Sequence, residues 1–222
     1  MTARSASPPP RPAPGQGRRE RNKADKRQRI FAAADRLFAE LGYTAVTTAQ
    51  IADEADVGTG TVFRYFASKA DLLVEVMSDK LRVGREHALE LADAGADPVE
   101  AILALVEPLV LAGATHPENT AVYHREALFA PAPEVRRRTR EVAELEDAID
   151  AILSRGTAAP EAARRMTAHA VYATLFVDVV RVTVDATAPD AAALTDTLRR
   201  HVTFLLSRLL PASADDAVAG RK

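Results

Sequence analysis

The stretch GYTAVTTAQIADEADVGTGTVFRYFASKADLL, residues 42–73, decides the fold of this chain. Thr47 followed by Gln50 three residues later forms a capping box, which predicts that a short helix begins there. A tight turn at residues 56–58 separates it from another short helix over about residues 59–66. Two short helices joined by such a turn are typical of a helix-turn-helix unit.

The segments on either side fit the same interpretation. Apolar residues recur with helical spacing over about residues 25–41, and Gly42 ends the predicted helix. Downstream, Ser68 and Asp71 form a second capping signature, which opens a longer helix. We therefore expect the helix-turn-helix to be buttressed by a longer helix that precedes it.

The two glycines of GTGTVF, residues 58–63, raise the alternative of a phosphate-binding loop. A dinucleotide-binding fingerprint needs a third glycine and a preceding strand, whereas this segment follows a predicted helix. A Walker-type loop needs a final Gly-Lys-Ser/Thr, which is missing. The helix-turn-helix interpretation is therefore favoured.

The second short helix of such a unit enters the major groove with its N-terminal residues at the base edges. Small residues there let the backbone approach DNA closely, and threonine hydroxyls bind bases or phosphates. The spacing turns Val62, Tyr65 and Phe66 toward the core. The residues expected to contact DNA are Gly58, Thr59, Gly60, Thr61, Phe63, Arg64 and Lys69.

This stretch resembles the DNA-binding domain of the tetracycline-repressor (TetR) family of transcriptional regulators. The matching features are Gly42-Tyr43, Thr47-Thr48, Ile51-Ala52, Val57, Gly60-Thr61, Tyr65-Phe66 and Ser68-Lys69. The resemblance covers residues 24–84, with the motif at about 47–66, and implies a larger helical ligand-binding and dimerisation domain over residues 85–210.

The resemblance also implies a role for each matched residue. Thr47, Thr48 and Lys69 would hold phosphates, whereas Thr59, Gly60 and Thr61 would face the bases. Phe63 and Arg64 stand where the family often has Tyr and His, which touch the DNA backbone or a base. A structural alternative stays open for the threonines, which could be helix caps only, and for Arg64, which could be a solvated surface charge.

Composition and charge agree with an all-α DNA-binding protein. Of the 222 residues 47% are hydrophobic, enough for a sizeable core, and no strand pattern is present. Residues 1–70 hold 12 Lys and Arg against 7 Asp and Glu, whereas residues 71–222 hold 17 against 24. The first third is therefore basic. We expect residues 1–23 to form a disordered basic arm, which could reach DNA or only aid solubility, and residues 211–222 a loose tail.

Two helices in the acidic part carry a pattern typical of a dimer interface. Apolar residues in residues 160–185 recur at alternating spacings of four and three, as in a heptad seam, and a helix over about residues 189–210 repeats the theme. The expected interface residues are Met166, Ala170, Ala173, Val177, Val180, Leu198, Val202 and Leu205. The alternative is that both helices are core helices of one chain.

The middle helices, about residues 98–154, are expected to surround a ligand pocket. Apolar walls with a few polar groups describe many ligand sites, although they also describe any core. The candidate lining residues are Leu105, Leu109, Phe129, Leu145, Ile149, His169, Tyr172 and Phe176.

Together these patterns predict a homodimeric DNA-binding regulator, more in keeping with a repressor than an activator. Its partners would be a pseudo-palindromic double-stranded operator and a mostly apolar small molecule. An enzyme is disfavoured because no nucleophile–base set, carboxylate pair or metal-ligand cluster has usable spacing, and no cysteine is present. No cofactor, metal or membrane span is expected, and a cytoplasmic location follows from the lack of a signal-like stretch. A regulator without a small-molecule effector, controlled by abundance or a protein partner, remains the alternative.

Overall fold

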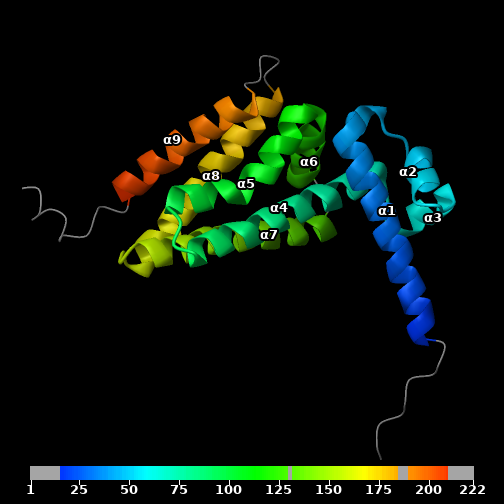
Figure 1. Cartoon of the computed structure of the whole chain (residues 1–222), viewed down its shortest axis with the longest axis horizontal. Coiled ribbons are helices and arrows are strands. Elements are labelled where there is room, and N and C mark those ends of the chain that lie inside the picture. Colours follow the sequence, from blue (N-terminus) through cyan, green and yellow to red (C-terminus); the bar gives the residue numbers. More distant parts are fainter. Residues whose placement is uncertain (1–15, 130–131, 185–189, 210–222) are drawn as a thin grey trace, which may run out of the picture.

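The computed structural model describes residues 16–129, 132–184 and 190–209. Within these ranges the chain forms nine α-helices and no strand, as the sequence predicts (Figure 1). The helices are α1 (Gln16–Ala45), α2 (Thr48–Glu54), α3 (Thr59–Tyr65), α4 (Lys69–Asp93), α5 (Pro98–Thr115), α6 (Pro117–Phe129), α7 (Ala132–Gly156), α8 (Glu161–Val184) and α9 (Ala191–Leu209).

The helices form a small N-terminal unit, α1 to α3, beside a larger bundle, α4 to α9 (Figure 1). The helix α4 begins beside α1 and continues into the bundle, so it belongs to both parts. The expectation of a disordered arm over residues 1–23 is wrong for residues 16–23, which form the first turns of α1. Residues 1–15 lie outside the described ranges, as does the predicted tail.

Side-chain caps fix the starts of the helices that position the N-terminal unit. The capping box is present at α2, because Gln50 N–H donates to Thr47 Oγ1 and Thr47 N–H donates to Gln50 Oε1. Ser68 caps α4 by accepting from the backbone N–H of Asp71 at 2.9 Å. These caps confirm the two helix starts that the sequence predicts.

A break near the end of α1 redirects the chain toward α2. Gly42 has φ 75° and ψ 163°, a backbone conformation that residues with a side chain rarely adopt. The sequence predicts that the helix ends at Gly42. Instead, the helix continues beyond this break, in a new direction, as far as Ala45.

Ion pairs join α1 to the helices that surround it. Arg36 pairs with Glu54 of α2, and Arg27 pairs with Glu75 of α4. Beneath them lies a continuous core whose fully buried side chains include Ile30, Phe38, Ile51, Phe66, Leu72 and Met77. The core positions α2 and α3 as one unit against α1 and the start of α4.

The most apolar helix, α5, runs through the bundle and contacts α4, α6, α7, α8 and α9. By length and composition it could cross a membrane, the single such helix in the described residues, but many of its apolar side chains are buried in this core. A Cβ at Gly84 of α4 would collide with the carbonyl of Leu105, so the missing side chain allows α4 and α5 to pack closely.

Candidate nucleic-acid interface and interior cavity

The helices α2 and α3 and their four-residue connection form the predicted helix-turn-helix. Asp56 in the turn has φ 50°, a left-handed conformation that Asp tolerates better than most residues with a side chain. Its carboxylate lies 3.2 Å from the guanidinium of Arg29 on α1. The acid that the sequence places in the turn is therefore paired with a cation.

The first turn of α3 is exposed and made of small residues. Gly58, Thr59 and Gly60 are exposed, and Thr61 is half-buried. A Cβ added at Gly58 or Gly60 would meet nothing within 4 Å, and neither glycine has a positive φ. Packing within the described part of the chain therefore does not require glycine at either position, whereas close approach of an external molecule would.

Along the remainder of α3, the buried and the exposed side chains are those that the sequence predicts. Val62 and Phe66 are buried, and Tyr65 is half-buried against the core. Phe63 is 51% exposed, and Arg64 is also exposed, with its guanidinium 5.6 Å from the centre of the Tyr65 ring. A large exposed aromatic ring next to a cation suits contact with a nucleic acid.

Thr47 and Thr48 lie at the start of α2 and differ in their freedom to bind a phosphate. The Thr47 hydroxyl donates to Gln50 Oε1 at 2.9 Å and accepts from Gln50 N–H, so its capping role is confirmed. Thr48 is half-exposed in the first turn of the helix. The phosphate contacts of both threonines stay predictions.

Lys69 has a structural role that the sequence interpretation missed. Its Nζ donates to the carbonyls of Tyr43 and Val46, each at 2.7 Å, and lies 4.1 Å from the centre of the Tyr43 ring. Partial burial lowers the pKa of this ammonium group. Lys69 therefore does not extend freely toward DNA. Two of its three N–H groups join α4 to the end of α1 and to the residue that follows it, and a phosphate contact through the third stays a prediction.

The bundle contains an apolar cavity of about 190 Å³ that most of the predicted pocket residues line. Leu105, Leu109, Leu145, Ile149, Tyr172 and Phe176 all contribute to its wall. The sequence interpretation missed Leu81 of α4 and Tyr123 of α6, whereas His124, which it considered as a polar anchor, does line the cavity. Helical spacing could have placed α6 in the core, but it could not identify which of its residues face a cavity.

Two predicted pocket residues lie elsewhere. Phe129 is 80% exposed at the end of α6, beyond the part of the helix that packs on the core. His169 is exposed on α8, where its Nδ1 lies 2.8 Å from Glu146 Oε1. Both predictions are wrong, because each side chain points away from the cavity wall.

The polar side of the cavity lies on α6 and α7. The Tyr123 hydroxyl donates to Glu141 Oε1 at 3.2 Å, and the His124 ring packs edge-on against the Tyr123 and Phe176 rings. These groups offer an apolar ligand a small number of polar contacts. In the described part of the chain, no group of three His, Cys, Asp or Glu side chains is placed to hold a metal ion.

A second, larger cleft of about 550 Å³ lies where α1, α4 and α7 meet. It shares Leu81, Glu141 and Leu145 with the apolar cavity, so the two spaces adjoin. Charged side chains surround the cleft, and Glu144 of α7 pairs there with both Arg85 and Arg140. Hydrogen bonds from Arg85 and then Arg140 lower the pKa of the Glu144 carboxyl.

The N-terminal unit matches a known family. Residues 30–76, which hold the end of α1, the helix-turn-helix and the start of α4, match the profile of "Bacterial regulatory proteins, tetR family". The chain therefore carries a tetR-family DNA-binding domain over these residues. The family resemblance is confirmed over residues 30–76, and the all-α architecture is confirmed over the described residues.

Individual relatives extend the match into the bundle. The HTH-type transcriptional repressor KstR of Mycobacterium tuberculosis is 33% identical over 134 residues, which are 60% of this chain and 59% of KstR. The chain thus matches less than two thirds of that relative's length. Thermus thermophilus FadR, a TetR-family repressor solved with lauroyl-CoA, has a TM-score of 0.62 and 26% identity over 84% of this chain and 96% of that one. Bacillus subtilis FadR with stearoyl-CoA has a TM-score of 0.54 and 21% identity, over 79% and 96%.

The last two helices of the chain present an exposed apolar row. On α8, Met166 is 63% and Val177 is 52% exposed, with Ala173 exposed between them and Ala170 and Val180 half-exposed. On α9, Phe204 is exposed beside the half-buried Leu205. A row of exposed apolar side chains of this kind is typical of a protein interface.

The predicted interface residues on α9 are partly wrong. Leu198 and Val202 are 1% and 0% exposed and pack in the core of their own chain. The helical period was identified correctly, but the side of α9 that faces inward was not. Phe204, which the sequence interpretation left out, lies on the outer side instead.

Proposed function

We propose that this chain is a homodimeric, sequence-specific DNA-binding regulator that represses transcription until a small molecule releases it. The proposal depends on the glycines at the start of α3. Both glycines are exposed, have room for a side chain and stand at the recognition end of a tetR-family helix-turn-helix. A cytoplasmic location accompanies this function, because the operator is there.

The exposed row on α8 supports a dimer as the DNA-binding form. Met166, Ala173 and Val177 would be covered by the same row of a second copy, as a two-fold interface requires. A two-fold axis would set the two α3 helices about one DNA turn apart, roughly 34–36 Å. The operator would then be a pseudo-palindrome with two inverted half-sites.

The cavity and its adjoining cleft support an elongated apolar effector. The cavity, at about 190 Å³, is smaller than the roughly 300–1,000 Å³ of typical ligand sites. A ligand that fills a site of typical volume must therefore widen this cavity or extend past Leu145 and Glu141 into the cleft. The lauroyl-CoA complex of Thermus thermophilus FadR supports an acyl thioester as the chemical class.

Release from DNA would follow from unequal ligand affinity for two conformations. An effector that favours a wider cavity shifts the population toward it, by no more than its differential affinity allows. Because the cleft lies between α1, α4 and α7, separation of these helices would change how the DNA-binding unit is held. The two α3 helices would then no longer match the groove spacing.

Selection of bound duplexes from a random DNA pool tests the proposal. We expect inverted half-sites with a fixed spacing, and release of the selected duplex when lauroyl-CoA is added. Recovery of unrelated or single-stranded sequences would contradict DNA-binding regulation. A selected palindrome that lauroyl-CoA leaves bound would contradict only the effector class.

A further inference from the structure

Asn119, in the first turn of α6, binds the backbone of α1 with both ends of its side-chain amide. Its Oδ1 accepts from the backbone N–H of Tyr43 at 2.7 Å, and its Nδ2 donates to the carbonyl of Phe38 at 2.8 Å. The residue is 3% exposed. A buried amide with both groups satisfied in this way fixes the relative position of the two helices.

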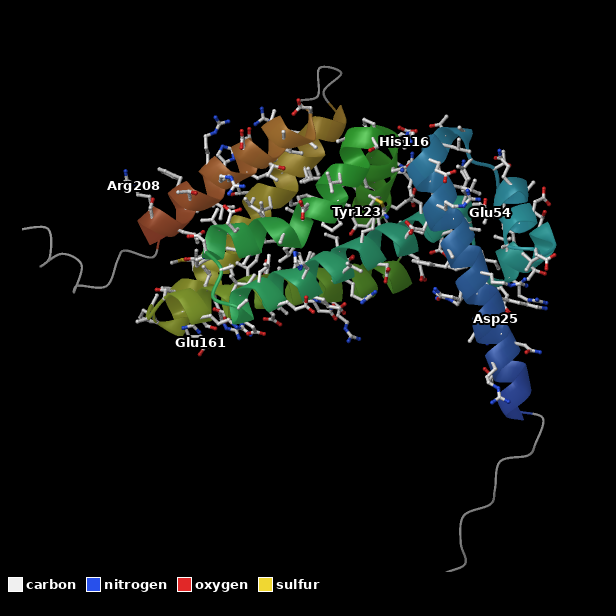
Figure 2. The ribbon with its side chains drawn as sticks, in the orientation of Figure 1. Asp25, Glu54, His116, Tyr123, Glu161 and Arg208 are labelled. Carbon is white, nitrogen blue, oxygen red and sulfur yellow. The ribbon has the colours of Figure 1, made fainter. Side chains whose placement is uncertain are left out.

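The two contacts of Asn119 flank the break in α1. An uninterrupted helix pairs each N–H with the carbonyl four residues earlier, and the non-helical Gly42 disturbs this ladder. Asn119 supplies partners to backbone groups on both sides of the break. A Cβ at Gly42 would also collide with Glu118 and His116, so the start of α6 lies tightly against the break. Figure 2 shows His116 at this boundary.

The same helix reaches the apolar cavity one turn later. Tyr123 and His124 follow Asn119 by four and five residues and line the cavity wall. The helix α6 contacts α1, α4, α5 and α8, so it joins the cavity to the DNA-binding unit directly. In Figure 2, Tyr123 lies inside the bundle on the side toward α1.

We infer that Asn119 is the positioning residue that couples occupation of the cavity to the orientation of the helix-turn-helix. An occupant that displaces Tyr123 and His124 moves α6 and withdraws the Asn119 amide from the break in α1. The segment after Gly42, and α2 with it, then loses one of the contacts that fix its direction. This inference rests on the proposed function, because it names the element through which the effector acts on the DNA-binding unit.

A second route through α4 makes a different prediction. The helix α4 contributes Leu81 to the cavity and begins at Lys69, so it could transmit the change as a rigid rod. Transmission through α4 alone would not need Asn119. Substitution of Asn119 therefore separates the two routes.

The first test compares ligand binding with operator release in Asn119→Ala. Lauroyl-CoA is titrated into the full-length protein without DNA, and the operator Kd is measured with and without saturating lauroyl-CoA. The matched control is Thr120→Val, since Thr120 is equally buried in the same turn but its hydroxyl has no hydrogen-bond partner among the described residues. Thermal melting confirms that each variant is folded, and Asn119→Ser provides a second, smaller change.

In the parent protein, we expect saturating lauroyl-CoA to raise the operator Kd by roughly 5- to 150-fold, the range of ordinary allosteric coupling. In Asn119→Ala and Asn119→Ser we expect lauroyl-CoA binding within about twofold of the parent, but a ratio of the two operator Kd values that falls to within about twofold of 1. Thr120→Val should keep the parent ratio. A parent-like ratio in the folded Asn119 variants overturns the inference and leaves the proposed function intact.

The second test needs no ligand. Val179 lines the cavity from α8, and Val179→Phe partly fills it. We expect Val179→Phe to weaken operator binding in the parent and in Thr120→Val, but to add no further loss in Asn119→Ala. Equal losses of operator affinity in the parent, Thr120→Val and Asn119→Ala, or no loss in the parent, would overturn the inference. If lauroyl-CoA fails to bind the parent, the proposed effector class fails and this cycle alone decides the role of Asn119.

Discussion

Asn119 and Lys69 bind opposite ends of one residue, Tyr43. The Asn119 side chain accepts from the Tyr43 N–H at 2.7 Å, and the Lys69 ammonium donates to the Tyr43 carbonyl at the same distance. One contact comes from α6 of the bundle and the other from the start of α4. The direction in which the chain leaves α1 for the helix-turn-helix is therefore fixed from two sides.

The first prediction concerns the stability contributed by Lys69. Lys69→Ala removes two charge-assisted hydrogen bonds to backbone carbonyls, and we expect the free energy of unfolding to fall by roughly 1.5–3 kcal/mol. Urea unfolding measures this loss. The control is Lys80→Ala, which removes a single partly exposed ion pair to Asp35 and should cost about 0–1 kcal/mol. Equal losses in the two variants would refute the structural role of Lys69.

The same variant decides whether Lys69 also contacts DNA. If its third N–H binds a phosphate, Lys69→Ala should lower the slope of operator affinity against salt by about 1, without changing sequence preference. An unchanged slope in the folded variant would restrict Lys69 to its structural contacts.

The dimer surface is tested by Val177→Arg. Val177 is 52% exposed in one chain, and a second copy covering it would bury an unpaired charge, which costs several kcal/mol. Analytical ultracentrifugation should show monomers with weakened operator binding. Leu111→Arg is the matched control, since Leu111 is equally exposed but lies on α5, outside the row. A dimeric Val177→Arg protein would place the interface elsewhere.

The cavity is tested by Tyr172→Ala, which removes an aromatic wall. Operator affinity without ligand should be largely kept, whereas the lauroyl-CoA concentration needed for release should rise about tenfold for each 1.4 kcal/mol of lost binding. His169→Ala should respond like the parent, because His169 lies on the same helix but on its exposed side. An unchanged response of folded Tyr172→Ala would show that the cavity is not the effector site.

Local patterns made the DNA-binding unit predictable from the sequence. The capping pairs Thr47–Gln50 and Ser68–Asp71 and the tight turn between α2 and α3 depend on neighbouring residues. Each is therefore visible in a short window of sequence. The long-range partners of Lys69 were not, because Tyr43 lies 26 residues away and meets Lys69 only in the folded chain.

The bundle was less predictable, because helical spacing shows which side of a helix is apolar but does not show what packs against that side. Leu198 and Val202 share the period of an interface, yet they face the core of their own chain. Likewise, Phe129 is an aromatic residue of the type that lines pockets, but it lies at the exposed end of α6. Asn119 gave no sequence signal, since its importance comes from contacts 76 and 81 residues away.

Gly60→Ala decides whether the first turn of α3 binds DNA. A Cβ at Gly60 meets nothing within 4 Å, so the substitution should leave the fold unchanged or stabilise it by about 0.4–1 kcal/mol. The added methyl would nevertheless separate the helix from the base edges. We expect a thermal midpoint at or above that of the parent together with a loss of operator affinity of about tenfold or more, equivalent to at least about 1.4 kcal/mol. A Gly60→Ala protein that binds the operator as tightly as the parent would show that the first turn of α3 does not approach the DNA bases.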